Sequence, residues 1–300
     1  LNPVSGAWRK AKDPDQLAIW AKQYGSRVRS SNYAGELDDL AYQEVKSGCR
    51  LLIAAGGDDT VREVLHGMDR AGAFKLPVEE RPFLGILPYG TFNNFARYLG
   101  VPLEIEAALE AAHQGRVCRV DLGRVNGLLF TESVGVGIDV AAWKQFPKES
   151  PSLLRRLWDG ALAVVRAITV FRPRRYFLEV DGQLQKVRAY NITVANSSHF
   201  AAGFAIAPHA VPDDGHLDLC IIPAISKLVF VLSIPLILLG KHTVYMRGVR
   251  YEQVTHVRLW AERNGVLRVD GSLGPRLPVE IEVLPQVLPI RLPSWPAGGG

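Results

Sequence analysis

A glycine turn that joins an apolar run to a helix-like run is the segment of this chain best suited to chemistry. Residues 51–54 are apolar and strand-like, and two glycines follow them. From residue 61 the apolar residues recur at the i, i+3, i+4 and i+7 positions of one helix face. Glycine lets a backbone approach an anion closely, and the N–H groups at a helix N-terminus point towards it. The pattern predicts a phosphate-binding turn formed by Gly56, Gly57, Asp58, Asp59 and Thr60.

Asp59 is the residue of this turn that does not suit an anion site, where a small neutral residue is expected. A carboxylate ~4 Å from a phosphate oxygen is repelled by about 1–4 kcal/mol, depending on the effective dielectric constant. Aspartate adopts positive φ angles more readily than most residues. We therefore expect the turn to form with Asp59 in it, but to bind phosphate less well.

A second loop follows the next expected strand, in residues 87–97. Gly90 frees the backbone there, Thr91 is expected to cap the helix that follows, and Asn93 adds a side-chain amide. As a bare helix start this segment would be unremarkable. It comes one strand–helix unit after the glycine turn, however, so the two loops are expected to form two walls of one crevice at the same sheet edge.

Three other polar turns carry groups able to bind ions. Asn2, Ser5 and Gly6 offer N–H and hydroxyl donors after a strand, although such a turn is more often a plain loop. Residues 213–218 carry three carboxylates around one glycine. That pattern suits either a solvated turn or a hard cation held by side-chain and carbonyl oxygens, and both interpretations stay open. Asp270 ends a strand-like run and, taken alone, indicates a plain turn.

The overall composition is that of a globular protein. The chain has 300 residues, of which 48% are hydrophobic and 22% charged, enough for a large core in one or two domains and too few charges for wholesale disorder. A net charge of +5 weakly favours anionic partners such as nucleotide phosphates or acidic lipids. Three widely spaced cysteines form no disulfide framework or metal-binding pattern, which is typical of the cytosol.

The chain changes character near residue 123. Before it, strand and helix patterns alternate, which predicts a parallel sheet with helices. After it, the pairs that begin at Asn126, Asp181 and Asn264, each followed by glycine, predict hairpins of an antiparallel β domain. We expect one domain from 1–123 plus about 285–300, and a second from 124–284. The expected strands of the first are 51–55 and 83–87, and its expected helices are 17–24, 36–47, 61–68, 91–99 and 105–113.

An apolar stretch in residues 228–239 has two interpretations. It contains Ser233 and Pro235 and is too short to cross a membrane as a helix. A packed helix is the default, and a lipid-facing element at a membrane surface is the alternative, because Lys227, Lys241 and Arg247 lie close by. The same two interpretations apply to an arginine-flanked apolar helix expected in residues 153–168.

Taken together, these segments resemble the diacylglycerol kinase catalytic-domain superfamily, in particular the soluble bacterial lipid kinases related to diacylglycerol and sphingosine kinases. The resemblance covers nearly the whole chain. It implies an α/β fold in two domains: an N-terminal NAD-kinase-like α/β nucleotide domain and a C-terminal antiparallel β-sandwich domain for the lipid, with the active site between them. It also implies transfer of the γ-phosphoryl group of ATP to a lipid hydroxyl with Mg²⁺.

Family motifs fall on the segments that bear polar groups. The GGDGT motif falls on residues 56–60, and a second nucleotide loop, PxGTxNxFAR, falls on residues 88–97. The family's metal-binding turn, PDDGxLD, falls on residues 212–218. The nucleotide-binding residues that the resemblance implies are Asn2, Ser5, Gly6, Gly56, Gly57, Asp58, Asp59, Thr60, Gly90, Thr91 and Asn93.

The resemblance also implies two places for a metal ion. In the acidic turn, Asp214 would supply a carboxylate, with the carbonyl groups of Val211 and His216 as further candidates. That ion resembles a structural one. Asp58 would help to hold the catalytic Mg²⁺, directly or through water.

Two departures from the family pattern bear on activity. Asp59 replaces a glycine, and the late DGE motif reads Asp270, Gly271, Ser272, so that a serine replaces the glutamate usually taken as the proton acceptor. Loss of a general base typically costs ~10²–10⁴-fold in rate. Asp270 is then the expected acceptor, because phosphoryl transfer depends mostly on positioning and charge stabilisation. A weak or inactive family member that binds lipid or nucleotide is one alternative, and an NAD kinase is the other.

The expected partners follow from this resemblance. A lipid is the expected substrate, diacylglycerol-like or sphingoid-like, whereas nucleic acid is not expected. A peripheral membrane surface and a homodimer are left open. The expected location is the cytoplasm, with the inner face of the membrane as a further alternative. Leu1 lies within what resembles a first strand, so a natural N-terminus that begins earlier is also expected.

Overall fold

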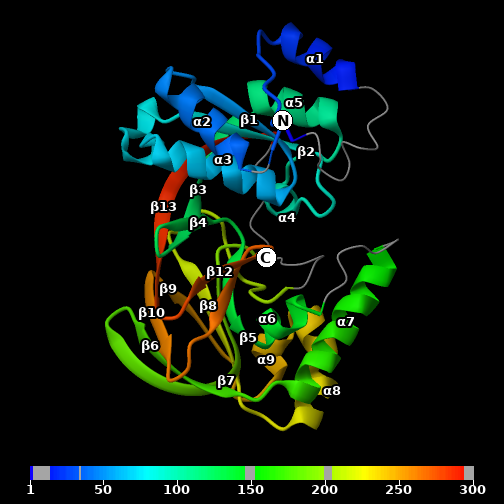
Figure 1. Ribbon diagram of the computed structural model, residues 1–300, viewed down its shortest axis with the longest axis vertical. Helices are drawn as coiled ribbons and strands as arrows, with labels where there is room; N and C mark the ends of the chain where they lie inside the picture. Colours follow the sequence, from blue (N-terminus) through cyan, green and yellow to red (C-terminus); the bar gives the residue numbers. More distant parts are fainter. Residues whose placement is uncertain (3–13, 34, 146–152, 199–204, 294–300) are drawn as a thin grey trace. The chain divides into compact units, whose positions relative to one another are not determined.

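The structure is a computed structural model that describes residues 1–2, 14–33, 35–145, 153–198 and 205–293 (Figure 1). The chain divides into two compact units. Unit 1 comprises Leu1–Leu122 and Pro285–Gly300, and unit 2 comprises Gly123–Leu284. The predicted fold class, an α/β unit and an antiparallel β unit, is confirmed.

Strands and helices alternate in unit 1, as the sequence predicted. Gly56 at the end of the first parallel strand lies opposite Pro88 at the end of the second, so both glycine loops leave the sheet at the same edge. Leu84 pairs with Ile290, which brings the last part of the final strand beside the second one. The elements are α1 (Pro14–Gln23), α2 (Glu36–Lys46), β1 (Leu51–Gly56), α3 (Asp58–Arg70), η2 (Ala73–Lys75), η3 (Val78–Glu80), β2 (Phe83–Pro88), α4 (Asn94–Tyr98), α5 (Ile105–Gln114), β3 (Arg116–Val125) and the end of β13 (Val279–Leu292).

Helix α3 buries the apolar face that its spacing predicted. Val61, Leu65 and Met68 are all buried, and the helix packs against β1 and α2. The approach to α2 is close at Gly67, where a Cβ atom would overlap the carbonyl oxygen of Asp38. This packing fixes the start of α3 at the edge of the sheet where β1 ends.

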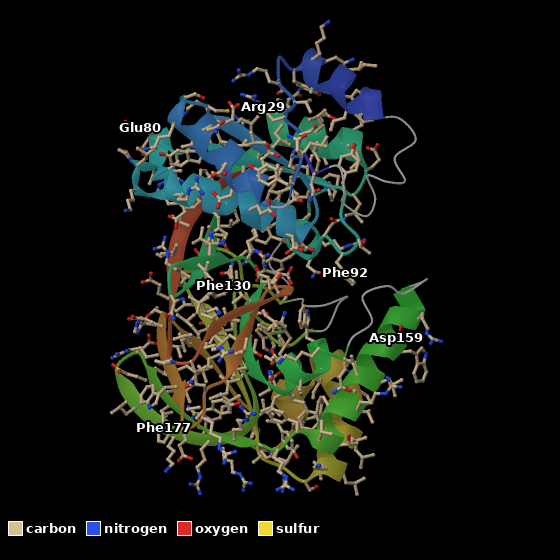
Figure 2. All side chains as sticks on the ribbon, in the orientation of Figure 1. Arg29, Glu80, Phe92, Phe130, Asp159 and Phe177 are labelled. Carbon is tan, nitrogen blue, oxygen red and sulfur yellow. The ribbon has the colours of Figure 1, made fainter. Side chains whose placement is uncertain are left out.

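The helix expected over residues 91–99 is shorter than predicted. It begins at Asn94, and Thr91 does not cap it, because the residue at the N-cap position is Asn93. Asn93 has a left-handed backbone (φ 51°), which a helix cannot contain. The prediction that Thr91 caps this helix is therefore wrong. Residues 90–93 form a turn that carries Phe92, labelled in Figure 2.

Unit 2 is built around the long strand β7. The first part of β7 pairs with β6, and its last part lies between β5 and β8, all antiparallel. Its elements are the end of β3, β4 (Leu128–Phe130), β5 (Ser133–Gly137), α6 (Ile138–Trp143), α7 (Leu153–Val170), β6 (Arg174–Val180), β7 (Gln183–Ala195), β8 (Leu217–Pro223), α8 (Lys227–Leu238), α9 (His242–Tyr245), β9 (Arg250–Val254), β10 (His256–Ala261), β11 (Val266–Val269), β12 (Ser272–Arg276) and the start of β13.

The last part of β7 and its neighbour β8 are buried on both faces, because each face is covered. Ile192 and Leu219 belong to the core enclosed by the strands, which also contains Phe130, labelled in Figure 2. Tyr190 and Cys220, which alternate with them, pack in a second core with residues of α6, α7 and α8. The sequence predicted the strands of this unit, a helix over 153–168 and, as the default, a packed helix over 228–239, but not that these helices form a layer on the outer face of the strands.

Two of the three predicted hairpin turns are confirmed. Asn126 and Asp181 both have positive φ angles and connect paired strands, β3 to β4 and β6 to β7. The prediction at Asn264 is wrong, since β10 pairs with β6 and β13 whereas β11 pairs with β5 and β12. The two-residue turn lies instead at Asp270 (φ 48°), where Val269 pairs with the first residue of β12.

The apolar stretch at 228–239 forms the greater part of α8. Phe230 and Ile234 on one of its sides are buried against the outer face of the strands. Within the part of the chain that the structure describes, we find no helix that is both long enough and apolar enough to span a membrane.

Candidate functional site

The two glycine loops of unit 1 touch through their backbones. The Gly90 N–H donates to the carbonyl oxygen of Gly56 at 3.1 Å. A Cβ atom on Gly57 would lie 3.1 Å from the Cα of Gly90, and a Cβ on Gly90 would overlap the Cα of Gly57. Position 90 therefore requires glycine, and at position 57 a side chain would need the facing backbone to shift. The structure therefore brings together the two loops that the sequence predicted as walls of one crevice.

The N-terminus of α3 lies within this contact. Gly57 is the N-cap residue, and within the described residues no side chain caps the helix. The first helical hydrogen bond runs from the Val61 N–H to the Gly57 carbonyl at 3.1 Å. The N–H groups before Val61 and the positive end of the helix dipole favour an anion at this place. This end of α3 can hold a phosphate group.

Asn2 and Thr60 join the start of the chain to the same turn. The Asn2 side chain donates to Oγ1 of Thr60 at 3.1 Å, and its backbone N–H donates to the Ala55 carbonyl at 3.0 Å. Thr60 is buried. The predicted donors Ser5 and Gly6 lie outside the described residues, so their role stays a prediction.

Asp58 and Asn93 hold the loops in shape. Oδ1 of Asp58 accepts a hydrogen bond from the Phe95 N–H at 3.1 Å, which ties α3 to α4. The side-chain amide of Asn93 donates to the carbonyl groups of Pro88 and Gly90, both at 3.0 Å, and its Oδ1 accepts from the Gly90 N–H at 2.8 Å. Asn93 thus positions the loop, and the exposed Thr91 lies between it and Gly90.

Asp59 lies in the first turn of α3, with its side chain 71% exposed. The turn forms with Asp59 in it, as expected, and the helical backbone of this residue does not need a positive φ angle. The carboxylate forms an ion pair with Arg62 at 2.8 Å. This pairing brings a positive charge to the start of α3 and offsets part of the repulsion expected between Asp59 and a phosphate.

In unit 2, buried polar residues gather where β5 begins and where β7 and β11 end. The register places Ser133 beside Ala195 on one side, and Val134 beside Val269 on the other. The ends of three neighbouring strands therefore meet. We call this set the polar cluster: Thr131, Glu132, Ser133, Asn196, Ser197, Ser198 and Asp270, all buried.

The carboxylate of Asp270 accepts hydrogen bonds from other residues of this cluster. Oδ1 accepts hydrogen bonds from the N–H groups of Glu132 (2.9 Å) and Ser133 (3.0 Å). Oδ2 accepts from the N–H and the hydroxyl of Thr131, at 3.1 Å and 3.3 Å. With 3% of Asp270 exposed and four donors on its two oxygens, the residue shapes segment 131–133. This geometry disfavours Asp270 as the proton acceptor, and that role stays a prediction.

A buried arginine supports the same cluster. Arg268 donates to the carbonyl oxygen of Asp270 and, at 3.1 Å, to the hydroxyl of Ser133. Its Nε lies 3.5 Å from Oδ2 of Asp139. Burial raises the pKa of Asp139, and the charge of Arg268 opposes that rise. Arg268 therefore fixes both the turn at Asp270 and the start of β5.

Glu132 is a residue that the sequence did not single out. It is only 3% exposed, directly beside Asp270, and its carbonyl oxygen accepts from the Asn196 N–H at 2.8 Å. Its charge also acts on the guanidinium of Arg268. The one signal in the sequence is an acidic residue inside an otherwise strand-like run. Ser272 begins β12 on the far side of the turn and is partly buried.

The acidic turn of unit 2 fits a cation only in part. Asp214 already accepts hydrogen bonds, at 3.0 Å from the His216 N–H and at 2.7 Å from the Gln253 side chain. Asp218 is buried, and its Oδ1 has no hydrogen-bond partner within the described residues. Burial, the largest cause, raises the pKa of Asp218 to about 6.

A buried carboxylate oxygen of this kind suits a cation, so Asp218 is a better candidate ligand than Asp214. Val211 is partly exposed at the edge of the turn, and the ring of His216 bonds back to the Asp214 carbonyl at 2.8 Å. In the described residues, no three His, Cys, Asp or Glu side chains converge into a preformed metal site. The predicted metal set therefore stays a prediction.

Comparison with known families covers almost the whole chain. Residues 1–125 match the diacylglycerol kinase catalytic domain, and residues 132–292 match the YegS C-terminal NAD kinase beta sandwich-like domain. The chain belongs to the family of lipid kinases that these two domains define, the diacylglycerol kinase catalytic-domain superfamily.

Individual relatives agree with this assignment. A diacylglycerol kinase of Bacillus subtilis (strain 168) is 29% identical over 299 residues, 98% of this chain and 95% of the relative. A diacylglycerol kinase of Staphylococcus aureus (strain MRSA252) is 27% identical over 301 residues, 98% of this chain and 91% of the relative. The crystal structure of a diacylglycerol kinase from Bacillus anthracis str. Sterne has a TM-score of 0.73 at 21% identity, covers 99% of this chain and 96% of its own, and so shares the fold.

Proposed function

We propose that this chain is an ATP-dependent lipid kinase that transfers the γ-phosphoryl group to a lipid hydroxyl, with a diacylglycerol-like lipid as the first candidate and a sphingoid-like lipid as the second. The observation that carries the proposal is the backbone contact of Gly57 and Gly90 at the uncapped start of α3. It supplies backbone N–H groups that would bind phosphate oxygens. Family membership and the names of the relatives support the lipid as acceptor.

On the nucleotide side, this chain's backbone would do most of the binding. The N–H groups at the start of α3 and in the turn after Gly90 would take the phosphate oxygens, and Asn2 and Thr60 would keep that turn in place. Asp58, which the Phe95 N–H holds at the start of α3, would bind Mg²⁺. When bound, this ion would supply positive charge that offsets the negative charge of the phosphates.

On the lipid side, we assign the proton of the lipid hydroxyl to the carboxylate of Glu132. The family's glutamate is absent at Ser272, and four hydrogen bonds occupy the carboxylate of Asp270. Glu132 is the other acidic residue of the polar cluster. Its backbone N–H donates to Asp270, and Arg268 bonds to the neighbouring Ser133, so both residues position its segment. The chain would thus keep a carboxylate for proton transfer at another position.

The test is a transfer assay with ATP labelled in the γ-phosphate, Mg²⁺ and a panel of dispersed lipids: diacylglycerol, a sphingoid base, phosphatidylglycerol and a control lipid without a free hydroxyl. A labelled lipid product from one of the first three is the expected result. Binding of ATP without any labelled product would instead support the inactive binding protein. A labelled product from NAD alone would support the NAD kinase.

A further inference from the structure

Exposed large apolar side chains gather on one group of helices in unit 2. Of the twenty such side chains in the described residues, nine lie on α7, α8 and α9 or directly after them. Single exposed apolar side chains are normal on a protein surface, whereas a concentration of them marks an interaction site. We call this set the α7–α9 surface: Trp158, Leu162, Val170, Leu228, Val229, Leu232, Leu239, Val244 and Tyr245.

Helix α8 is apolar on both its inner and its outer side. Phe230 and Ile234 face inwards and are buried. Leu228 and Leu232 lie on the opposite side, four residues apart, and each is 70% exposed. Leu239, directly after the helix, continues the same line. A helix that is apolar all round is normally covered on every side, yet no described part of this chain covers the outer side of α8.

Helix α7 presents a mixed apolar and basic side. Trp158, which is 75% exposed, and Leu162 lie on one side, while Ala163 and Ala167 are buried on the other. Arg155 has the spacing of that exposed side and is itself exposed. Arginine and tryptophan together are typical of a helix at a lipid–water boundary, because the arginine stem stays among apolar groups while its head reaches water.

The two helices form one layer. They pack against each other, and Lys227 at the start of α8 donates to the carbonyl oxygen of Thr169 near the end of α7 at 2.8 Å. Figure 1 shows α8 directly behind the lower part of α7, and Asp159 marks α7 in Figure 2. The helices that carry these exposed apolar side chains are therefore neighbours in unit 2.

The segment that carries α8 and α9 has charges of one sign, whereas on α7 Arg155 pairs with Asp159 at 3.2 Å. From residue 219 to residue 251 the chain contains no aspartate or glutamate, while Lys227, Lys241 and Arg247 in that stretch are exposed. Basic side chains around an apolar surface complement the negative potential of anionic lipids. The same charges would repel one another across a symmetric contact with a second copy of this chain.

We propose that the α7–α9 surface docks this protein on a phospholipid bilayer that contains anionic lipids. The exposed leucines of α8 and Trp158 of α7 enter the boundary between headgroups and acyl chains, and Lys227, Lys241 and Arg247 lie among the headgroup phosphates. The proposal rests on the proposed function in one respect: a lipid substrate resides in such a bilayer. The docking itself needs no turnover.

The test is flotation of the full chain with vesicles of phosphatidylcholine alone or mixed with phosphatidylglycerol. The test variant carries Leu228→Ser and Leu232→Ser, and the matched control carries Leu184→Ser, a leucine that is 74% exposed at the start of β7 and outside the α7–α9 surface. We expect the double variant to lose roughly tenfold or more of its vesicle partitioning. The control should bind as the parent does.

A second variant tests the charges. Lys241→Gln with Arg247→Gln should weaken binding to the phosphatidylglycerol vesicles and leave the weak binding to pure phosphatidylcholine unchanged. Equal flotation of the parent and the leucine variant would overturn the proposal. The docking proposal would also be overturned if the parent formed a dimer without lipid and the leucine substitutions converted it to a monomer. The partner of this surface would then be a second copy of the chain.

Activity on dispersed substrate separates this proposal from the proposed function. In detergent micelles the leucine variant should phosphorylate the lipid as fast as the parent, because no residue of the nucleotide loops or the polar cluster is changed. A parent that floats through α8 but never transfers phosphate would leave the docking surface intact and refute the kinase. If the parent transfers phosphate but the leucine variant floats as well as the parent, the kinase stands and the docking surface is refuted.

Discussion

The glycine loops of unit 1 and the polar cluster of unit 2 differ in how they use their residues. In the loops, Gly57 and Gly90 act through their backbones, so a side chain such as Asp59 can change and point into solvent. In the polar cluster, the function would depend on one carboxylate, and the family's carboxylate is missing at Ser272. Anion binding by a backbone tolerates substitution, whereas proton transfer needs a group of the right kind within reach.

Removing the carboxylate of Glu132 has the largest expected effect. We predict that Glu132→Gln lowers the transfer rate ~10²–10⁴-fold, the usual contribution of a general base, and leaves the affinity for ATP unchanged. Asp270→Asn provides the contrast, because it removes an acceptor of backbone N–H groups and should lower the melting temperature. Rates measured at saturating ATP, together with thermal melting curves, check both. If Glu132→Gln transferred phosphate at the parent rate, Asp270 would again be the candidate general base.

Forcing the two glycine loops apart has the next largest expected effect. In Gly90→Ala the new Cβ would overlap the Cα of Gly57 and push the loops apart. We predict an ATP affinity about 10–100-fold lower, equivalent to about 1.4–2.8 kcal/mol. Gly265→Ala is the matched control, because its Cβ would meet a leucine side chain at 3.3 Å and needs only a small shift. Equal ATP affinity for the two variants would show that the loops do not bind the phosphates.

The buried Asp218 predicts a pH dependence of stability. Its pKa is about 6 when folded and 3.8 in the reference state, so the folded state binds this proton more tightly. Its contribution is present below pH 3.8 and is lost as the pH rises through about 6, by about 3 kcal/mol at most.

Asp218→Asn should therefore flatten the stability profile between about pH 4 and 6 and stabilise the protein at pH 7. Mg²⁺ or Ca²⁺ should raise the melting temperature of the parent at pH 7 and not that of the variant. Thermal melting across pH, with and without the cation, measures both effects. An equal cation response in the two proteins would place the ion elsewhere.

The ion pair at the start of α3 has the smallest expected effect. Arg62→Gln should weaken ATP binding about two- to fivefold, because it leaves the Asp59 carboxylate unpaired near the phosphates, and Asp59→Asn should strengthen it by a similar factor. The double variant should resemble the parent. Titrations of ATP at two salt concentrations measure these shifts. A loss of activity in Asp59→Asn would instead make Asp59 a ligand of Mg²⁺.

Local signals predicted the parts of the fold that local chemistry decides. The strand, glycine turn and helix around Gly56 were predictable because apolar periodicity and glycine fix them within a few residues. The turns at Asn126 and Asp181 were predictable because each of these residues, followed by glycine, favours a positive φ angle. Asn264 carries an identical signal, but the pairing of β10 and β11 with other strands decides its structure. Strand pairing depends on residues far apart in the chain, so a dipeptide alone does not predict it.

The candidate site shows the same division. The glycine loops were predictable because backbone contact requires glycine and therefore leaves a motif. Glu132 leaves no motif, because its place depends on burial by strands far away in the chain. Asp218 lies within a motif, but the motif does not show that its Oδ1 is buried without a hydrogen-bond partner among the described residues. The hydrogen bonds that occupy Asp270 come from segment 131–133, almost 140 residues earlier, so the sequence could not show that its carboxylate is already used.

The most direct test of the central claim measures phosphoryl transfer to dispersed diacylglycerol in four proteins: the parent, Glu132→Gln, Ser272→Glu, and Glu132→Gln combined with Ser272→Glu. Glu132 supplies the carboxylate in this account, so the parent should be active, Glu132→Gln should bind ATP but fail to transfer phosphate, and the added glutamate should restore part of the rate. An inert parent that becomes active with Ser272→Glu alone would contradict the account, because the chain would then lack any substitute for the missing glutamate.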